Sequence, residues 1–147
     1  MTINDQIMEI SAVLPAYNEV NNLAEVVRGL LAALREVASH FEIIIVDDGS
    51  EDGTKELADS LARENDSIRV VHHQTNLGYG AALRSGFAIA GLPWIFFTDA
   101  DGQFEPREIS KLVSAASGHG FAAGIRLKRA DPWRRRVYGL LFSAAVR

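Results

Sequence analysis

The sequence contains no cysteine, and it has no apolar run long enough to cross a membrane. The missing cysteine excludes a disulfide framework, a thiolate metal site and a cysteine nucleophile, and it fits a reducing compartment. A spanning helix needs about 20 predominantly apolar residues, and the longest candidate, residues 137–146, is shorter. The polar and acidic residues 1–9 are unlike a signal peptide. We therefore expect a chain that neither enters the secretory route nor crosses a bilayer.

Two common nucleotide-binding signatures and a histidine metal site are missing as well. Residues 76–80 form a glycine-containing loop that can bring backbone amides near phosphates. The loop lacks the Gly-x-Gly-x-x-Gly spacing of dinucleotide sites and the Gly-Lys-Ser/Thr of a P-loop. Adjacent strand residues point opposite ways, so we interpret His72 and His73 as structural. A dehydrogenase and a P-loop NTPase are therefore not indicated.

Length and composition are those of one globular domain, but charge is unevenly distributed. The chain has 147 residues, is 48% hydrophobic and contains no low-complexity tract. Its net charge is −4, of which residues 126–147 carry +6, so that the other 125 residues carry −10. This basic segment suggests contact with something anionic, although on charge alone a solvated arm or helix face is the simpler interpretation.

Apolar periodicity predicts an alternation of strands and helices. Short apolar runs that end in turn signals predict five strands, at residues 10–14, 41–46, 68–71, 94–97 and 121–125. Helical spacing or a helix-start signal occurs at four places, at residues 23–37, 52–61 and 81–90 and from residue 106 onward. This order predicts an α/β domain of three αβα layers, with a mainly parallel, twisted sheet and helices on both faces.

Acidic and turn-forming residues follow three of the predicted strands. Residues 15–19 follow the first strand, Asp47 and Asp48 follow the second, and residues 99–103 follow the fourth. Ligands of open α/β sheets bind outside the carboxyl ends of the strands. The sequence therefore predicts one functional site at this edge of the sheet.

The clearest of these groups is Asp99-Ala100-Asp101-Gly102-Gln103. Two carboxylates and an amide at this spacing direct hard oxygen ligands to one point, which suits Mg²⁺ or Mn²⁺ and leaves room for diphosphate oxygens. Asp-x-Asp pairs are also common in solvated turns. The position directly after a buried strand favours a metal site with Asp99, Asp101 and Gln103 as ligands.

The other two groups have a functional and a local structural interpretation each. Asp47 and Asp48 can accept hydrogen bonds from a nucleobase or a ribose, but the segment also suits a turn and a helix cap, with Ser50 and Asp52 in that role. Tyr17 can stack on a base and Glu19 can accept a hydroxyl. The structural alternative for this second segment is a helix start with Asn18, Asn21 or Asn22 as the cap.

Taken together, these motifs resemble family 2 glycosyltransferases of the GT-A fold. The residues that carry the resemblance are Val-Leu-Pro-Ala-Tyr-Asn-Glu at 13–19, Val-Asp-Asp-Gly-Ser at 46–50, Asn-Leu-Gly at 76–78 and Asp-Ala-Asp-Gly-Gln at 99–103. More narrowly, they are similar to the dolichyl-phosphate mannose synthase and polyprenyl-phosphate glycosyltransferase branch. The resemblance covers nearly the whole chain and implies a Rossmann-like nucleotide-diphospho-sugar transferase domain over residues 1–147.

The resemblance also implies roles for individual residues. The nucleotide pocket would be formed by Pro15, Tyr17, Glu19, Asp47, Asp48 and Gly78. The catalytic group would be Asp99, Asp101 and Arg126, with Mg²⁺ or Mn²⁺ held by Asp99, Asp101 and Gln103. Arg126 stands in Ala-Gly-Ile-Arg, which resembles the family's Gly-x-Arg, whose arginine meets phosphate.

The implied reaction is an inverting transfer of a hexose from a nucleoside-diphosphate sugar, of GDP-mannose or UDP-glucose type, to polyprenyl or dolichyl phosphate. A phosphate monoester has its second pKa near ~6 and is largely dianionic at neutral pH, so the reaction needs no general base. Residues 126–147 would face the acceptor or the membrane, as a helix on the membrane surface or as a helix packed on the domain. We expect a cytoplasmic protein bound peripherally to the membrane, without a nucleic-acid partner.

Family members usually continue beyond the point where this chain ends, so the resemblance implies an apparently truncated C-terminus, with a complete donor half and an incomplete acceptor half. One alternative is a nucleotide-sugar-binding module without turnover. Another is a family 2 glycosyltransferase with a saccharide acceptor. A sugar nucleotidyltransferase is disfavoured because its glycine-rich signature is missing after the first strand.

Overall fold

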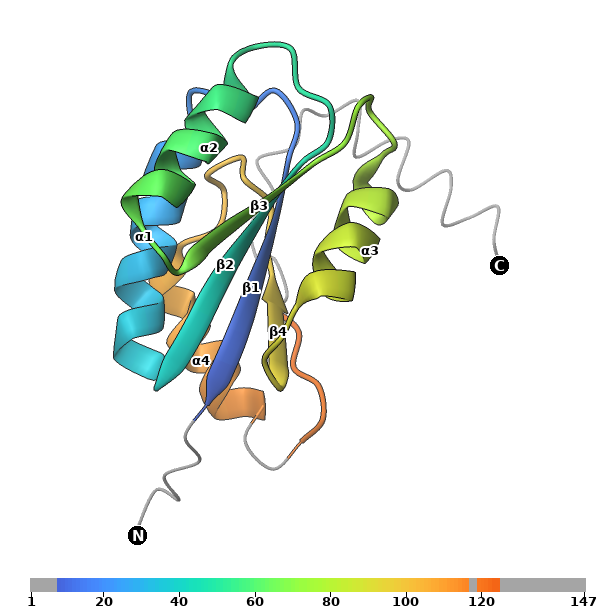
Figure 1. The fold of residues 1–147 in the computed structure, drawn as a ribbon. Coiled ribbons are helices and arrows are strands. Elements are labelled where there is room, and N and C mark those ends of the chain that lie inside the picture. The colour runs from blue at the N-terminus through green and yellow to red at the C-terminus, as the bar shows by residue number, and fades with distance from the viewer. Residues whose placement is uncertain (1–7, 117–118, 125–147) are drawn as a thin grey trace, which may run out of the picture.

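The computed structural model describes residues 8–116 and 119–124 (Figure 1). Its elements are β1 (Glu9–Ala16), α1 (Leu23–Val37), β2 (His40–Asp47), α2 (Thr54–Glu64), β3 (Ile68–His72), α3 (Tyr79–Ile89), β4 (Trp94–Phe97), the 3-10 helix η1 (Pro106–Glu108) and α4 (Ile109–Ala116). The predicted alternation is confirmed up to α4. Pro106 begins a 3-10 turn, and the α-helix proper follows at Ile109. Within the described ranges, no helix is long and apolar enough to cross a membrane.

The four strands form one parallel sheet in the order β3-β2-β1-β4. Ala16 of β1 pairs with Asp47 of β2, and Asp47 in turn pairs with His72 of β3. Val13 pairs with Phe97 of β4 on the other side of β1. The carboxyl ends of all four strands therefore lie along one edge of the sheet, the upper edge in Figure 1.

Side chains of the central strands alternate between two apolar layers, as the two-residue period of a strand requires. Ile43 and Ile45 of β2 belong to the layer that also contains buried residues of α1, α2 and α4. Ile44 and Val46 belong to the other layer, together with Ala82 of α3. Figure 1 shows α1, α2 and α4 on one side of the sheet and α3 on the other. The predicted three-layer arrangement is confirmed.

Helix α3 lies unusually close to the sheet at Gly86. A Cβ atom added there would be 2.3 Å from Cγ1 of Val13, which is closer than two carbon atoms can approach. A glycine at this position therefore lets the helix backbone pack directly on β1. The contact also fixes the height of α3 above the strands whose ends carry the polar residues.

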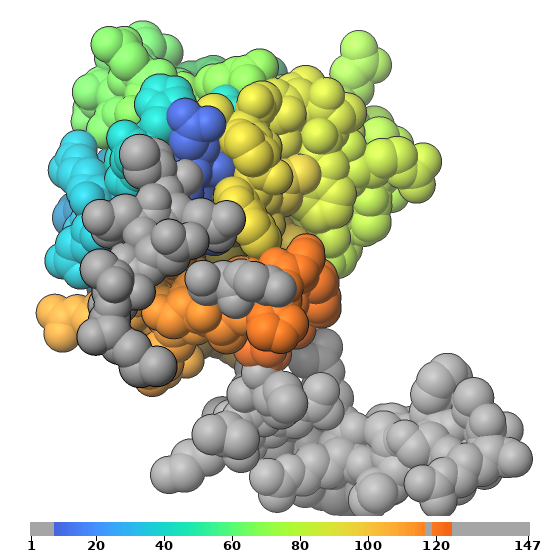
Figure 2. All heavy atoms as spheres, turned by 90° about the horizontal axis from the view of Figure 1, so that it is seen from below, coloured from blue at the N-terminus to red at the C-terminus, as the bar shows by residue number. Residues whose placement is uncertain are grey.

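The strand predicted at residues 121–125 is wrong for the residues that the structure describes. Residues 121–124 have no regular secondary structure, and Ile125 lies outside the described part. An apolar run becomes a strand only when its backbone pairs with a neighbouring strand. Here the side chain of Ala122 packs on the core, whereas Phe121 is 76% exposed. The run instead lines a cavity of about 660 Å³ between β4 and α4. Figure 2 shows the orange surface of α4 and residues 119–124 beside the yellow surface around β4.

Candidate functional site

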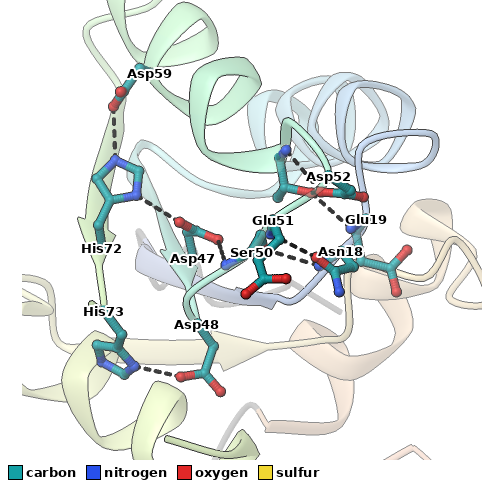
Figure 3. A network of polar contacts seen from close by, with 11 residues as sticks. Asn18, Glu19, Asp47, Asp48, Ser50, Glu51, Asp52, Asp59, His72 and His73 are labelled. Carbon is teal, nitrogen blue, oxygen red and sulfur yellow. Dashed lines mark hydrogen bonds and ion pairs between the residues drawn. The ribbon is translucent and has the colours of Figure 1, made fainter. Parts of the chain in front are cut away.

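The loop after β1 is held by the loop after β2. Asn18 donates its backbone N–H to Oγ of Ser50 at 3.0 Å, and its side-chain Oδ1 accepts the N–H of Glu51 at 2.9 Å. Asn18 has a positive φ of 56°, a left-handed conformation that asparagine tolerates better than most residues. Figure 3 shows this exchange of hydrogen bonds. The two loops thus form one structural unit at the sheet edge.

The same unit leads directly into α1 and α2. Oδ1 of Asp52 accepts the N–H of Thr54, the first residue of α2, while its Oδ2 accepts the N–H of Val20 at 3.2 Å. Oγ1 of Thr54 accepts the N–H of Glu19 at 2.8 Å. Ser50 and Asp52 thus make turn contacts and hold the loop after β1, but the cap role is not confirmed, because the N-cap of α2 is Gly53, without a side-chain cap hydrogen bond. Asn22 does stand at the N-cap of α1, but its amide donates to the Glu19 carboxylate and makes no side-chain cap.

Asp47 points to the α2 side of the sheet, where His72 binds it. Nδ1 of His72 lies 2.9 Å from Oδ2 of Asp47, and Nε2 lies 2.9 Å from Oδ1 of Asp59 on α2 (Figure 3). Burial alone would lower the pKa of His72, but the hydrogen bonds and charges of Asp59 and Asp47 outweigh it and raise that pKa. Oδ1 of Asp47 accepts the N–H of Ser50. Both oxygens of this carboxylate, which is 1% exposed, therefore have partners within the protein.

Asp48 points to the α3 side and makes a second cluster. Its Oδ1 lies 2.6 Å from Nδ1 of His73 and accepts the N–H of Leu77, while its Oδ2 accepts the N–H of Gly78 at 2.8 Å. Nε2 of His73 contacts Oγ of Ser85 on α3 at 2.8 Å. Burial alone would raise the pKa of Asp48, but the hydrogen bonds from His73, Leu77 and Gly78 lower it. The amides of Leu77 and Gly78 thus bind Asp48, so they do not reach outward to a phosphate.

The residues predicted to hold a metal lie directly after β4. Oδ1 of Asp99 is buried and has no hydrogen-bond partner. Oδ1 of Asp101 accepts the N–H of Gln103 at 3.0 Å, which bends the chain into a short turn, and the side chain of Gln103 is exposed. Buried carboxylate oxygens without a partner are rare in proteins and call for an explanation such as an ion. Residues 8–116 and 119–124 contain no group of three or more acidic or histidine side chains arranged for a metal.

Tyr79, the first residue of α3, is a member of this site that the sequence did not single out. Partial burial, a hydrogen bond with Asp99 and the negative charges of Asp99 and Asp101 raise the pKa of Tyr79 to about 12. Its side chain nevertheless remains 52% exposed. Tyr79 directly follows the loop at 76–78. The sheet order places β3 and β4 at opposite edges, so the approach of Tyr79 to Asp99 depends on how this loop and α3 cross the sheet.

The structure brings most of the predicted residues to the same edge. Pro15 is buried in β1, whereas Tyr17 is 45% exposed and Glu19 is partly exposed. The ends of β2, β3 and β4, with the loops that follow them, carry the others at this edge, namely Asp47, Asp48, Gly78, Asp99, Asp101 and Gln103. Arg126 and the basic segment at 126–147 lie outside the described residues.

The sequence has relatives among named enzymes. It is 35% identical over 145 residues to an undecaprenyl-phosphate 4-deoxy-4-formamido-L-arabinose transferase of Aeromonas hydrophila, covering 97% of this chain and 44% of that protein. It is 42% identical over 130 residues to the enzyme of the same name from Pseudomonas paraeruginosa, covering 86% of this chain and 38% of that protein. The chain therefore spans less than half the length of these curated relatives.

Solved structures with the same fold include two that were determined in complex with a nucleotide sugar. One is the mannosyltransferase PcManGT of Pyrobaculum calidifontis in complex with GDP-Man and Mn²⁺, with a TM-score of 0.65, 22% identity and coverage of 74% of this chain and 32% of that one. Another is TarS 1-349 of S. aureus in complex with UDP-GlcNAc, with a TM-score of 0.64, 23% identity and coverage of 85% and 37%. These similarities confirm the predicted GT-A-type fold.

The family model described as glycosyl transferase family 2 matches residues 11–144, which is most of the chain and includes nearly all of β1 and every later element up to α4. This match agrees with the motifs at the ends of β1, β2 and β4 and with the parallel sheet that places them together. The chain belongs to glycosyl transferase family 2.

Proposed function

We propose that this chain forms the donor-binding part of an inverting glycosyltransferase that moves a hexose from a nucleoside-diphosphate sugar to a polyprenyl phosphate. The observation that carries the proposal is the buried Oδ1 of Asp99, which has no partner and lies at the sheet edge where the other loops of the site meet. An anionic oxygen in that position favours a cation. The sugar diphosphate is the substrate that such a cation recruits.

Asp99 and Asp101 fit a divalent metal and would hold Mg²⁺ or Mn²⁺ together with Gln103. These are hard oxygen ligands, and their small number leaves positions for diphosphate oxygens. When bound, such an ion would neutralise the negative charge that develops on the departing nucleoside diphosphate. The complex of PcManGT with GDP-Man and Mn²⁺ supports the choice of such an ion for this chain.

The nucleoside would lie against the unit formed by the loops after β1 and β2. Tyr17 is exposed and available for stacking on the base, and Glu19 is partly exposed and available to a ribose hydroxyl. Pro15, Asp47 and Asp48 are buried. We assign these three a share in the pocket's shape, since both carboxylates already have partners inside the protein.

A lipid phosphate is the acceptor that this chain's residues favour. The relatives are named for undecaprenyl-phosphate, and a phosphate dianion attacks the anomeric carbon without a general base. Arg126 would meet a phosphate, and the basic segment at 126–147 would meet anionic head groups at the cytoplasmic face of a membrane. All of these residues lie outside the described part of the chain.

A second candidate is a donor-binding module without turnover. It is favoured because the roles proposed for the described residues all concern the donor, whereas those proposed for the acceptor fall on residues 126–147, outside the described part. Such a module would bind the nucleotide sugar without transferring the sugar.

A transfer assay separates the two candidates. The protein is incubated with undecaprenyl phosphate, Mn²⁺ and radiolabelled GDP-mannose or UDP-glucose, and label is counted in the organic phase. Transfer to lipid, abolished in the Asp101→Asn variant, supports the enzyme. Binding of the donor without transfer or hydrolysis supports the module. Absence of donor binding contradicts both.

A further inference from the structure

The buried carboxylate of Asp48 binds the loop between β3 and α3. It is 4% exposed, and its two oxygens contact three groups from this region, the ring of His73 and the backbone amides of Leu77 and Gly78. His73, whose side chain is 8% exposed, continues the contact to Ser85 on α3. A buried carboxylate with three donors is a strong anchor because charge-assisted hydrogen bonds are shorter and stronger than neutral ones.

The backbone conformation of the loop allows its amides to reach the Asp48 carboxylate. Gly78 has φ 92° and ψ 159°, a combination that is essentially restricted to glycine. A Cβ atom on Gly49 would lie 2.4 Å from the carbonyl carbon of Thr75, so the loop also rests directly on the backbone that follows Asp48. The path of the loop thus depends on the backbone that follows β2 and on Gly78, whose amide turns toward Asp48.

The next residue along the chain is Tyr79, the first residue of α3; burial, a hydrogen bond with Asp99 and the charges of Asp99 and Asp101 raise its pKa. A continuous set of contacts therefore runs from His73 through Asp48 and the amides of Leu77 and Gly78 to Tyr79 and the end of β4. Rotation or withdrawal of the loop would move Tyr79 away from Asp99.

We propose that Asp48 and His73 are positioning residues, which hold the loop at 75–78 so that Tyr79 fixes the Asp99 carboxylate in the orientation needed for metal and nucleotide. This role rests on the function proposed above. Neither residue is assigned a contact with the ligand, because both are buried and their polar atoms contact the protein. Groups that orient metal ligands in this indirect way typically change metal affinity 10- to 100-fold when they are replaced.

His73→Phe is the most direct test, because it keeps a ring in place and removes both polar contacts. Two quantities are measured by NMR and calorimetry: hydrogen exchange of the Leu77 and Gly78 amides, and the affinity for Mn²⁺ together with UDP or GDP, whichever the unaltered protein binds. We expect faster exchange of both amides and roughly a tenfold weaker metal-dependent affinity. His73→Gln, which keeps a donor for Asp48, should restore part of both.

Two further variants serve as a control and as a substitute for His73→Phe. His72→Phe alters the neighbouring histidine on the other face of the sheet and should leave exchange at Leu77 and Gly78 unchanged. Ser85→Ala removes only the outer partner of His73 and serves where His73→Phe does not fold, with the same direction of change expected.

Three results overturn the proposal, and they can be told apart. Unchanged exchange at Leu77 and Gly78 in both His73→Phe and Ser85→Ala shows that the loop is not held in this way. Faster exchange with unchanged metal-dependent affinity shows a purely structural role. Absence of Mn²⁺ and nucleotide binding in the unaltered protein refutes the proposed function and the positioning role with it, whatever the exchange of the amides shows.

Discussion

His72 and His73, neighbours at the end of β3, point to opposite faces of the sheet, and each contacts one of two neighbouring aspartates at the end of β2 (Figure 3). His72 joins Asp47 to Asp59 on α2, whereas His73 joins Asp48 to Ser85 on α3. The two-residue alternation of paired strands produces this arrangement. This edge of the sheet is therefore bound separately to α2 on one face and to α3 on the other.

The pKa of His72 provides a first prediction. It is raised above the ordinary value of 6.5 by the two carboxylates. The stabilisation from protonated His72 should therefore be complete below pH 6.5 and be lost as the pH rises through the folded-state pKa. We expect Asp59→Asn to lower the pKa of His72, measured by NMR titration of the ring, and to reduce this pH dependence. Glu56→Gln on the same helix is the control, and an equal shift in both variants would contradict the assignment.

Gly86→Ala should destabilise the fold. The added methyl group would lie 2.3 Å from Cγ1 of Val13, and overpacking of this kind costs about 1–3 kcal/mol. Gly80→Ala, also in α3, is the matched control because a Cβ there meets nothing within 4 Å; it should be neutral or slightly stabilising. The free energy of unfolding in urea checks both. Equal effects of the two substitutions would mean that α3 does not approach β1 as closely as described.

Asp48→Asn should destabilise the protein at neutral pH, because the amide cannot accept all the hydrogen bonds of the carboxylate. A buried donor left without an acceptor costs about 1–3 kcal/mol. The pKa of Asp48 is lowered in the folded state, so its contribution is present above its unfolded-state pKa, near ~4, and is lost as the pH falls through the folded-state pKa. Urea unfolding from pH 7 to pH 3 should show the difference between the two proteins shrinking in acid. A constant difference over this range would count against the charged cluster.

Replacing Arg134, Arg135 and Arg136 with alanine should weaken binding to vesicles that contain anionic lipid, since each basic residue near such a surface contributes about 1 kcal/mol. The control removes the same charge from exposed positions of α1 and α2, at Arg28, Arg35 and Arg63. Sedimentation with vesicles measures both. Equal losses in the two triple variants would remove the specific membrane role proposed for the basic segment.

The sequence predicted the elements well where apolar spacing and end signals agree. The helix predicted at 23–37 is α1, with identical bounds, because its apolar stripe and its packing face coincide. β4 likewise has the predicted bounds. The common edge of the polar residues also followed from sequence, since strand–helix alternation implies a parallel sheet.

Pairwise contacts within the site could not be predicted in this way. Asp48 and His73 are 25 positions apart, and their contact depends on the register of β2 with β3, which spacing along one strand does not show. The approach of Tyr79 to Asp99 depends on how the loop after β3 and α3 cross the sheet, because β3 and β4 lie at its opposite edges. The run at 121–125 misled because apolar composition alone does not provide a strand with a backbone partner.

The central claim is tested most directly by calorimetric titration with UDP, GDP and their sugar conjugates, with and without Mn²⁺, on the unaltered protein and on Asp101→Asn. Asp66→Asn, a change of the same charge at an exposed turn between α2 and β3, is the control. We predict metal-dependent binding of one nucleotide that is lost in Asp101→Asn and retained in Asp66→Asn. Binding that is unaffected by Mn²⁺ or by Asp101→Asn, or no binding of any nucleotide, would contradict the assignment of this edge as a metal-dependent donor site.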